Sequence, residues 1–276
     1  MNSPITFAVV GHPNKGKSSV VAALTRQDQI AISEISGTTT EAQAFSLNLN
    51  GETLYTLVDT PGFQRPRQML EHVTQNAPTA AERKVAIESF IQTNKEGAAT
   101  NGRFKDEIEL LEPILDGANI IYVVDGSVPY TPEYEAEMTL LQWTGAARMA
   151  LINPIRGTQY TEQWQAALGQ YFSVVHVFNP MQSSLEQHLA ILNAFEAISH
   201  TNSSKGSNSY QHIRAQLLTF AKQQEQQAAV AIAQFLQQSL GLEQSAPLPN
   251  EQLEHSIKQG LQARYKSAIN ELEVAL

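Results

Sequence analysis

The 276-residue sequence contains no cysteine, few charged residues and no long hydrophobic run. The absence of cysteine excludes disulfide bonds and thiolate metal sites. Charged residues make up only 16% of the chain and hydrophobic residues 42%, so uncharged polar residues must supply much of the surface. Low charge combined with adequate hydrophobic content favours a collapsed, globular chain over a disordered one.

The sequence also lacks the features that direct a chain to or through a membrane. A transmembrane helix needs about 18 consecutive apolar residues, and no run in this sequence approaches that length. The first residues, Met1 to Ile5, have neither the charged region nor the sustained apolar region of a secretory signal. We therefore expect a cytoplasmic protein, and leave open a peripheral association with the inner membrane through a downstream segment.

The sequence also has fewer basic than acidic residues. The formal net charge is −9, with 18 Lys and Arg against 27 Asp and Glu. Broad nucleic-acid binding normally needs a basic face that displaces counterions from phosphates. We therefore expect no nucleic-acid partner.

What is present is an alternation of short apolar runs with helical patterns. The runs predict strands at 5–10, 45–49, 53–58, 119–125, 149–153 and 174–178. Helical spacing predicts helices at 18–25, 79–93, 103–116, 131–143, 161–170 and 184–199. Asn50-Gly51 predicts a hairpin turn between the second and third strands. This order predicts an α/β fold, with a mostly parallel sheet and helices on both faces.

The same pattern suggests where the domains begin and end. Residues 1–200 form one domain, with a helical insert at about 63–118, because a structureless loop of that length is rare. Residues 201–209 have the composition of a flexible linker. Residues 210–276 predict two helices, the second beginning near Asn250. These helices form either an antiparallel hairpin or a coiled coil that docks a second copy or an effector.

The chemistry begins directly after the first strand. Gly11-His-Pro-Asn-Lys-Gly-Lys17-Ser18 fits the phosphate-binding loop pattern G-x-x-x-x-G-K-[ST], between an apolar strand and a helical pattern. The glycines let backbone N–H groups curl around phosphate oxygens, and the following helix adds its dipole. Lys17 would reach the β- and γ-phosphates, and the Ser18 hydroxyl would bind Mg²⁺.

Two further segments complete a nucleotide site. Asp59-Thr-Pro-Gly62 follows the third strand, where Asp59 could hold Mg²⁺ through a water and the Gly62 N–H could bind the γ-phosphate. Between this segment and the P-loop lies Ser36-Gly-Thr-Thr-Thr40. A threonine there could contact Mg²⁺ in the triphosphate state only, which would give loops 33–41 and 60–75 two conformations.

Together these three segments resemble the Era/TrmE-like branch of the translation-factor-related GTPases. The resemblance covers residues 5–62, and the motifs that carry it are Gly11-x-Pro-Asn-x-Gly-Lys-Ser-Ser19 and Gly37-Thr-Thr39. It implies that Thr39 binds magnesium and that Asn14 coordinates a potassium ion. A second resemblance extends to about residue 200 through Gly102-Arg-Phe-Lys-Asp-Glu and Ile-Tyr-Val-Val-Asp125. It relates the chain to bacterial GTPase-like proteins that carry a C-terminal domain of unknown function.

The sequence departs from the GTPase pattern at two positions. Phe63 follows Asp-Thr-Pro-Gly, where many GTPases have a glutamine that orients the attacking water, so we expect slow turnover. Guanine selection normally uses Asn-Lys-x-Asp, but here the strand end reads Leu151-Ile-Asn153-Pro, which keeps the asparagine and lacks the aspartate. Discrimination against ATP should therefore be blunted.

The predicted function is that of a slow, Mg²⁺-dependent GTPase that switches between GTP and GDP states, with K⁺ as a second candidate ion. The alternative is a non-catalytic or relaxed-specificity nucleotide-binding module that regulates a protein partner, or a homodimer, through its C-terminal helices. The predicted site comprises a nucleotide-binding set (Gly11, Asn14, Lys15, Gly16, Lys17, Ser18, Ser19, Gly62 and Asn153), a metal set (Ser18, Thr39 and Asp59) and a catalytic set (Lys17, Asn14 and Thr39).

Overall fold

The computed structural model describes residues 4–25, 41–96, 102–199 and 206–240, together with 255, 257–263 and 265–266. The chain divides into two compact units, Met1–Arg214 and Ala215–Leu276. The predicted strands, the P-loop and the helical insert all belong to the first unit. Within the described residues, no helix has the length and hydropathy needed to cross a membrane.

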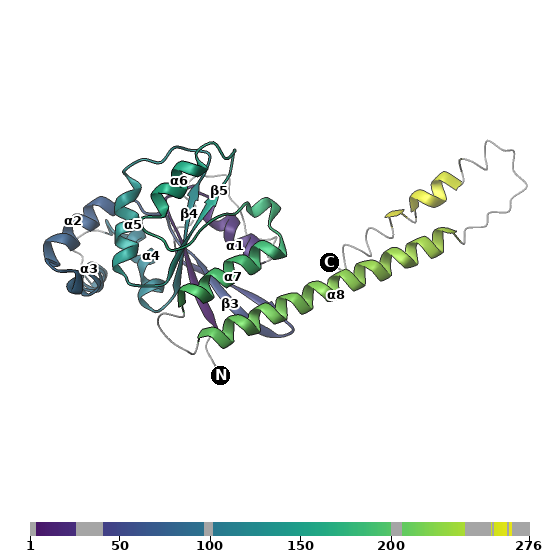
Figure 1. Cartoon of the computed structure of the whole chain (residues 1–276), viewed down its shortest axis with the longest axis horizontal. Helices are drawn as coiled ribbons and strands as arrows, with labels where there is room; N and C mark the ends of the chain where they lie inside the picture. Colours follow the sequence, from purple (N-terminus) through teal and green to yellow (C-terminus); the bar gives the residue numbers. More distant parts are fainter. Residues whose placement is uncertain are drawn as a thin grey trace, which may run out of the picture. The chain divides into compact units, whose positions relative to one another are not determined.

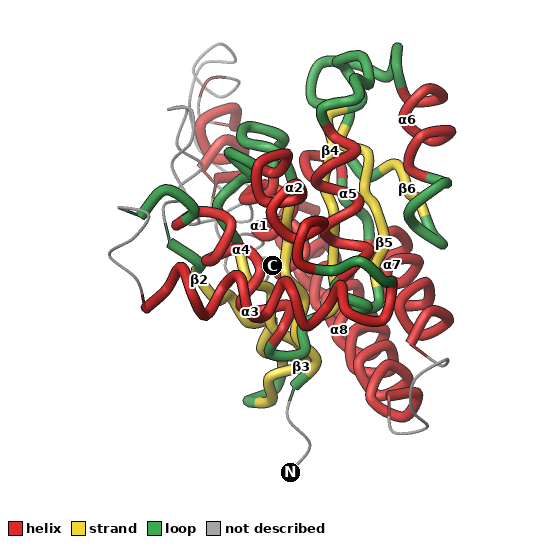
Figure 2. The backbone as a smooth tube through the Cα atoms, turned by 90° about the vertical axis from the view of Figure 1, so that its left-hand side faces the viewer, coloured by secondary structure: helices red, strands yellow, loops and turns green. Residues whose placement is uncertain are grey.

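The described part of the first unit is built on a six-stranded sheet in the order β2-β3-β1-β4-β5-β6. Figure 2 shows the strands in yellow among the helices. The strands are β1 (Ile5–Val10), β2 (Gln43–Leu49), β3 (Glu52–Asp59), β4 (Asn119–Asp125), β5 (Arg148–Asn153) and β6 (Val175–Val177). Among the described strand pairs, β2–β3 is antiparallel and the other four are parallel. Its turn places Asn50 and Gly51 at φ of 52° and 79°, the conformation that favours Asn-Gly in a tight hairpin. The predicted mostly parallel sheet and its hairpin are confirmed.

Helices cover both faces of the sheet. Figure 1 shows α4 (Lys105–Leu115) and α5 (Tyr134–Trp143) on one side, and α1 (Lys17–Thr25) and α7 (Leu185–Ser199) on the other. Successive strand residues point to opposite faces. In β1, Ala8 and Val10 therefore join the core cluster under α4 and α5, whereas the ring of Phe7 lies 4.5 Å from that of Phe195 in α7. α6 (Thr161–Leu168) adds the fully buried Trp164 to the first of these cores.

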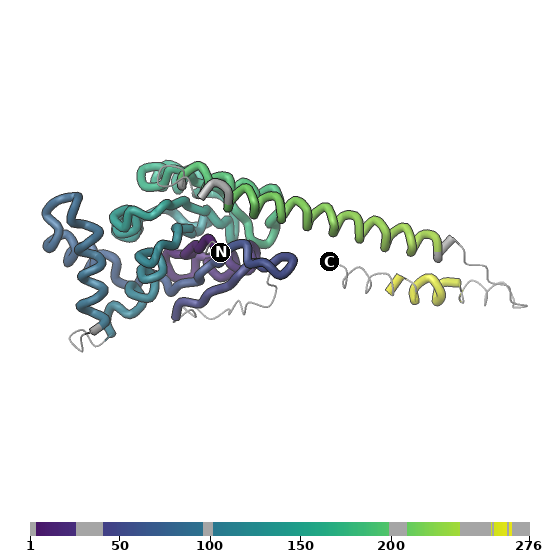
Figure 3. Tube along the Cα trace, turned by 90° about the horizontal axis from the view of Figure 1, so that it is seen from below, coloured from purple at the N-terminus to yellow at the C-terminus, as the bar shows by residue number. Residues whose placement is uncertain are grey.

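The predicted insert between β3 and β4 is helical. It contains α2 (Pro66–Asn76), the short 3₁₀ helix η1 (Ala80–Glu82), α3 (Arg83–Glu96) and α4. Figure 3 shows this segment in blue at one end of the first unit. The sequence pattern predicted the second and third α-helices of the insert but not α2, which begins at Pro66. Proline is favourable at the first helical position, because its missing N–H would be unpaired there anyway.

The helix α8 (Gly206–Leu240) starts earlier than the sequence predicted. Gly206 to Ser209, part of the predicted linker, are helical, and residues 200–205 lie outside the described chain. The first turns of α8 belong to the first unit, where Tyr210 and Ile213 are 3% and 2% exposed. Of the second predicted C-terminal helix, residues 257–263 and 265–266 are helical and most of the rest is not described, so the hairpin stays a prediction.

Candidate nucleotide-binding site

The P-loop has a backbone that strongly favours glycine at two of its positions. Gly11 and Gly16 have φ of 146° and 82°. A Cβ atom on Gly11 would lie 2.4 Å from the carbonyl oxygen of Val123, and one on Gly16 would lie 2.3 Å from Nδ2 of Asn153. Asn14, between them, is exposed with φ of 61°. Backbone N–H groups of such a loop turn toward one concave side, which suits an anion.

Lys17 is a buried cation at the start of α1. Its side chain is 7% exposed, and Nζ donates to the carbonyl oxygens of Gly11 at 3.3 Å and His12 at 3.2 Å. Burial lowers the pKa of Lys17 from 10.5 to about 8, and the negative charges of Asp59 and Glu137 partly oppose that fall. A polyanion that binds beside this ammonium would stabilise its charged form and offset the cost of its burial.

Ser18 and Asp59 come together at the end of β3. The Ser18 hydroxyl donates to Oδ2 of Asp59 at 2.6 Å, although 41 positions separate them, and Asp59 is 4% exposed. A hydroxyl and a carboxylate are oxygen ligands of the kind that Mg²⁺ prefers. The two described members of the predicted metal set are therefore adjacent, and they lie at the first turn of the helix that carries Lys17.

The segment after Asp59 lies against the P-loop. The Thr60 hydroxyl donates to the carbonyl oxygen of Val9 at 2.8 Å, and the Phe63 N–H donates to that of Gly11 at 3.3 Å. A Cβ on Gly62 would lie 2.5 Å from the backbone nitrogen of Pro13. The Phe63 side chain is fully buried in the core. Phe63 therefore anchors the loop and does not face the phosphate side.

Asn153 lies at the carboxyl end of β5, beside the P-loop. It is 4% exposed, and its Nδ2 donates to the carbonyl oxygen of Lys15 at 3.2 Å. The predicted base-contacting strand end thus shares a hydrogen bond with the phosphate-binding loop. Lys15 also places its Nζ 5.9 Å from the ring centroid of Tyr134.

The comparison with protein families agrees with this geometry. The family model described as "50S ribosome-binding GTPase" matches residues 6–152. The chain belongs to this GTPase family. The match covers the P-loop, the Asp59 segment and β5 up to Ile152, one residue before Asn153.

Individual relatives cover parts of this GTPase-family chain. GTPase Der of Xanthomonas campestris is 29% identical over 196 residues, which cover 68% of this chain and 40% of Der. The structure of Aquifex aeolicus Era bound to GDP·AlF₄⁻ has a TM-score of 0.44 and 16% identity, over 68% of this chain and 55% of that chain. A structure of Era with MgGDPNP and a 16S ribosomal RNA segment has the same TM-score and identity, over 70% of this chain and 57% of that chain. The chain spans less than half the length of this Der relative.

Of two further residues in the predicted GTPase site, the structure describes Ser19 but not Thr39. Ser19 is half-buried in the first turn of α1, next to Ser18. Thr39 lies outside the described residues, as does the rest of the predicted loop 33–41 except Glu41. Its predicted metal and catalytic roles therefore stay predictions.

Sequence reasoning missed a buried carboxylate behind the P-loop. Glu137 of α5 is 1% exposed, and its two oxygens bond Nδ1 of His12 at 2.8 Å and the hydroxyl of Tyr122 at 2.9 Å. His12 also packs edge-on against the Tyr134 ring at 5.4 Å. Through these contacts, Glu137 and Tyr134 of α5 hold His12 and so fix the P-loop on this side. A glutamate among the apolar residues of a core-facing helix is the signal that could have revealed it.

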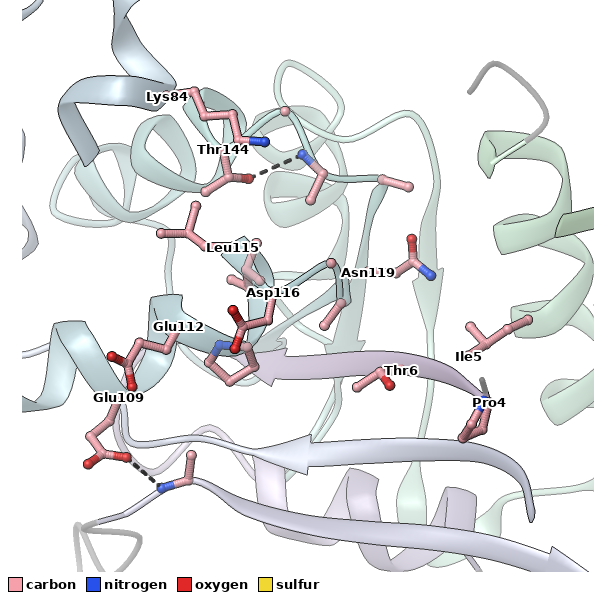
Figure 4. Close-up of a pocket in the computed structure, with 18 of the residues that line it drawn as sticks. Pro4, Ile5, Thr6, Lys84, Glu109, Glu112, Leu115, Asp116, Asn119 and Thr144 are labelled. Atoms are coloured by element: carbon pink, nitrogen blue, oxygen red, sulfur yellow. Dashed lines mark hydrogen bonds between the residues drawn. The ribbon is translucent and has the colours of Figure 1, made fainter. Parts of the chain in front are cut away.

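A cavity of about 830 Å³ lies elsewhere in the first unit (Figure 4). Its lining includes Ile5 and Thr6 at the start of β1, Asn119 at the start of β4, and the carboxylates Glu109 and Glu112. The P-loop follows the other end of β1, so the cavity lies at the opposite edge of the parallel strands. It is therefore separate from the candidate nucleotide site.

Proposed function

We propose that this chain binds GTP and GDP together with Mg²⁺ and hydrolyses GTP slowly, as a nucleotide-dependent switch. The observation that carries the proposal is the 2.6 Å hydrogen bond between Ser18 and Asp59, next to the buried ammonium of Lys17. Phosphates need a cation and aligned N–H groups, and Mg²⁺ needs oxygen ligands. The residues present fit both groups.

Each side chain has a distinct role in this proposal. Lys17 would exchange its bonds to two backbone carbonyls for bonds to the β- and γ-phosphates, which relieves the cost of its burial. Ser18, Asp59 and Thr39 would hold Mg²⁺, which when bound neutralises charge on the phosphate oxygens. The Gly62 N–H would bind the terminal phosphate. Asn14 would coordinate K⁺, as the family resemblance implies.

Base recognition rests on Asn153 in this proposal. Its side chain already bonds the Lys15 carbonyl, so the same amide links base and phosphate recognition. The aspartate that usually reads guanine is missing after it, since Pro154, Ile155 and Arg156 follow. We therefore propose a modest preference for guanine over adenine.

Equilibrium titration with fluorescent GTP, GDP and ATP analogues tests the proposal, in Mg²⁺ with either K⁺ or Na⁺. We expect Lys17→Ala to abolish binding, and Asp59→Asn to remove the dependence on Mg²⁺. Clear guanine preference supports the switch, and equal affinity for ATP overturns the guanine specificity. Phosphate release at equal rates in Na⁺ and K⁺ would overturn the role of Asn14.

Cytoplasmic location and a protein partner or homodimer at the C-terminal helices belong to the same proposal. The second unit carries exposed apolar side chains on α8, among them Val230, Ile232 and Leu236, which are 50–56% exposed. Cross-linking at several protein concentrations, with GTP or GDP bound, tests a homodimer directly. If the protein is a monomer with GTP and with GDP, the homodimer is refuted, and the C-terminal helices would have to bind a different protein.

A further inference from the structure

Glu107 is a carboxylate in the middle of an apolar helix face. It lies on α4 and is 0% exposed, and Leu110, Leu111 and Ile114 on the same face of the helix are 0–3% exposed. Glutamate is almost never fully buried unless it is paired, because an ionised carboxylate loses its hydration there. A residue kept at such a position needs a physical reason.

The partners of Glu107 are backbone groups just beyond Gly62. Its Oε1 accepts the N–H of Gln64 at 2.8 Å and that of Arg65 at 2.5 Å. Arg65 is the N-cap of α2, and its own side chain makes no capping bond. Glu107 therefore caps α2 from another helix, and its negative charge lies at the positive end of the α2 dipole.

The second carboxylate oxygen of Glu107 makes its burial cost free energy of folding. Within the part of the chain that the structure describes, Oε2 is buried and has no hydrogen-bond partner. A buried acceptor without a partner destabilises the fold. A hydrophobic residue would avoid the buried charge but would leave the N–H groups of Gln64 and Arg65 without this acceptor, so what Glu107 supplies at this cost is its hold on that segment.

A second set of bonds joins the same two segments. Nη1 of Arg65 donates to the carbonyl oxygen of Arg103 at 2.7 Å, and Nη2 of Arg103 donates to Oε1 of Gln68 at 2.8 Å. Arg103 and Glu107 belong to the Gly102-Arg-Phe-Lys-Asp-Glu107 segment that the sequence singled out. This segment is thus a part of the insert that contacts the residues after Gly62.

The fixed points of that loop surround Gly62. On one side, Thr60 bonds Val9 of β1. On the other, Phe63 is buried in the core and Gln64 bonds Glu107. Gly62 lies between these fixed points, so the direction of its N–H depends on where they hold the chain.

We propose that Glu107 is a positioning residue that fixes the loop 59–65 so that the Gly62 N–H faces the terminal phosphate. The proposal rests on the proposed function, because it assigns the binding of that phosphate to Gly62. Phe63 cannot orient a water, so preorganised backbone donors must carry more of the catalysis. Glu107 then acts in the GTP state and not in the GDP state, which lacks the γ-phosphate.

Three variants separate this role from general stability. Glu107→Ala removes the acceptor, Glu107→Gln keeps one acceptor oxygen, and Leu110→Ala is the matched control, a fully buried truncation on the same helix. The measurements are the affinities for fluorescent GDP and a non-hydrolysable GTP analogue, the single-turnover rate of GTP hydrolysis, and backbone hydrogen exchange at Gln64 and Arg65.

For Glu107→Ala, we expect GDP affinity close to that of the native chain and a fall in hydrolysis rate of about tenfold or more, because a small misplacement of a catalytic donor is costly. Affinity for the GTP analogue should fall while exchange at Gln64 and Arg65 speeds up. Glu107→Gln should recover a large part of each loss, and Leu110→Ala should leave the ratio of GTP to GDP affinity unchanged.

Other results overturn the inference in distinguishable ways. If Glu107→Ala and Leu110→Ala lower both affinities in parallel, Glu107 has only a structural role. If the native chain binds no nucleotide, the proposed function fails and takes the role of Gly62 with it. Unchanged exchange at Gln64 and Arg65 in Glu107→Ala would refute the capping bonds themselves, whatever the nucleotide results.

Discussion

Replacing Lys17 with methionine should abolish nucleotide binding without destabilising the nucleotide-free protein. The burial that lowers the pKa of Lys17 from 10.5 to about 8 corresponds to a cost of about 3 kcal/mol at neutral pH. Methionine fills similar space without a charge. The variant loses two hydrogen bonds to backbone carbonyls, each worth about 1 kcal/mol. The net expectation is a gain of about 1 kcal/mol in the free energy of unfolding.

The dependence on pH gives this prediction a second, independent test. The pKa of Lys17 is lower in the folded state than in the unfolded state, so between about pH 8 and 10.5 the unfolded chain binds more protons. The stability of the native chain therefore rises with pH in that window, whereas below it the cost of burial is constant. Relative to Lys17→Met, the native chain should gain about 1 kcal/mol between pH 7 and pH 9.

Urea denaturation of both proteins without nucleotide, at pH 7 and pH 9, measures these quantities. Lys84→Met, at an exposed lysine of α3, controls for the loss of a positive charge. A loss of more than about 2 kcal/mol in Lys17→Met at pH 7, with a gap between the two proteins that does not change with pH, would refute the reasoning. It would mean that Lys17 stabilises the empty P-loop.

Three further substitutions follow from the packing of the site. Gly62→Ala would push a Cβ to 2.5 Å from Pro13, so GTP hydrolysis should fall with little change in GDP affinity, and unchanged single-turnover rates would contradict this. Asn153→Ala leaves the Lys15 carbonyl without its partner, which should cost about 1–3 kcal/mol of GTP affinity by titration, and Asn153→Ser is the milder control. Phe63→Ala opens a cavity at a fully buried position and should cost about 3–5 kcal/mol in urea denaturation, where a loss below about 1 kcal/mol would show that the ring does not anchor the loop.

The sheet was predictable from the sequence because its strands follow a simple pattern. The run Asn119–Asp125 matches β4 residue for residue, since a strand buried on both faces reads as continuous apolar sequence. The P-loop was predictable for a different reason, because phosphate binding needs Gly11, Gly16, Lys17 and Ser18 at one fixed spacing within eight consecutive residues. Local patterns of this kind are visible without knowledge of the rest of the fold.

The parts that the sequence did not reveal depend on contacts between distant residues. Glu107 bonds Gln64, and Glu137 bonds His12 over 125 positions, and no periodicity encodes such pairs. The start of α8 was missed because Gly206 and the polar residues after it have the composition of a linker. The role of Thr39 and the expectation of no nucleic-acid partner stay predictions.

The way α8 begins has a practical consequence for anyone who shortens this protein. The Tyr210 hydroxyl accepts a bond of 3.4 Å from Nδ2 of Asn119, and His212 lies 3.0 Å from the carboxylate of Glu52. A chain cut at residue 200 would strip this covering from Asn119 and Glu52 and expose apolar surface to aggregation. A fragment that ends at Arg214, the last residue of the first unit, retains these contacts and lies fourteen residues beyond the boundary that composition alone suggests.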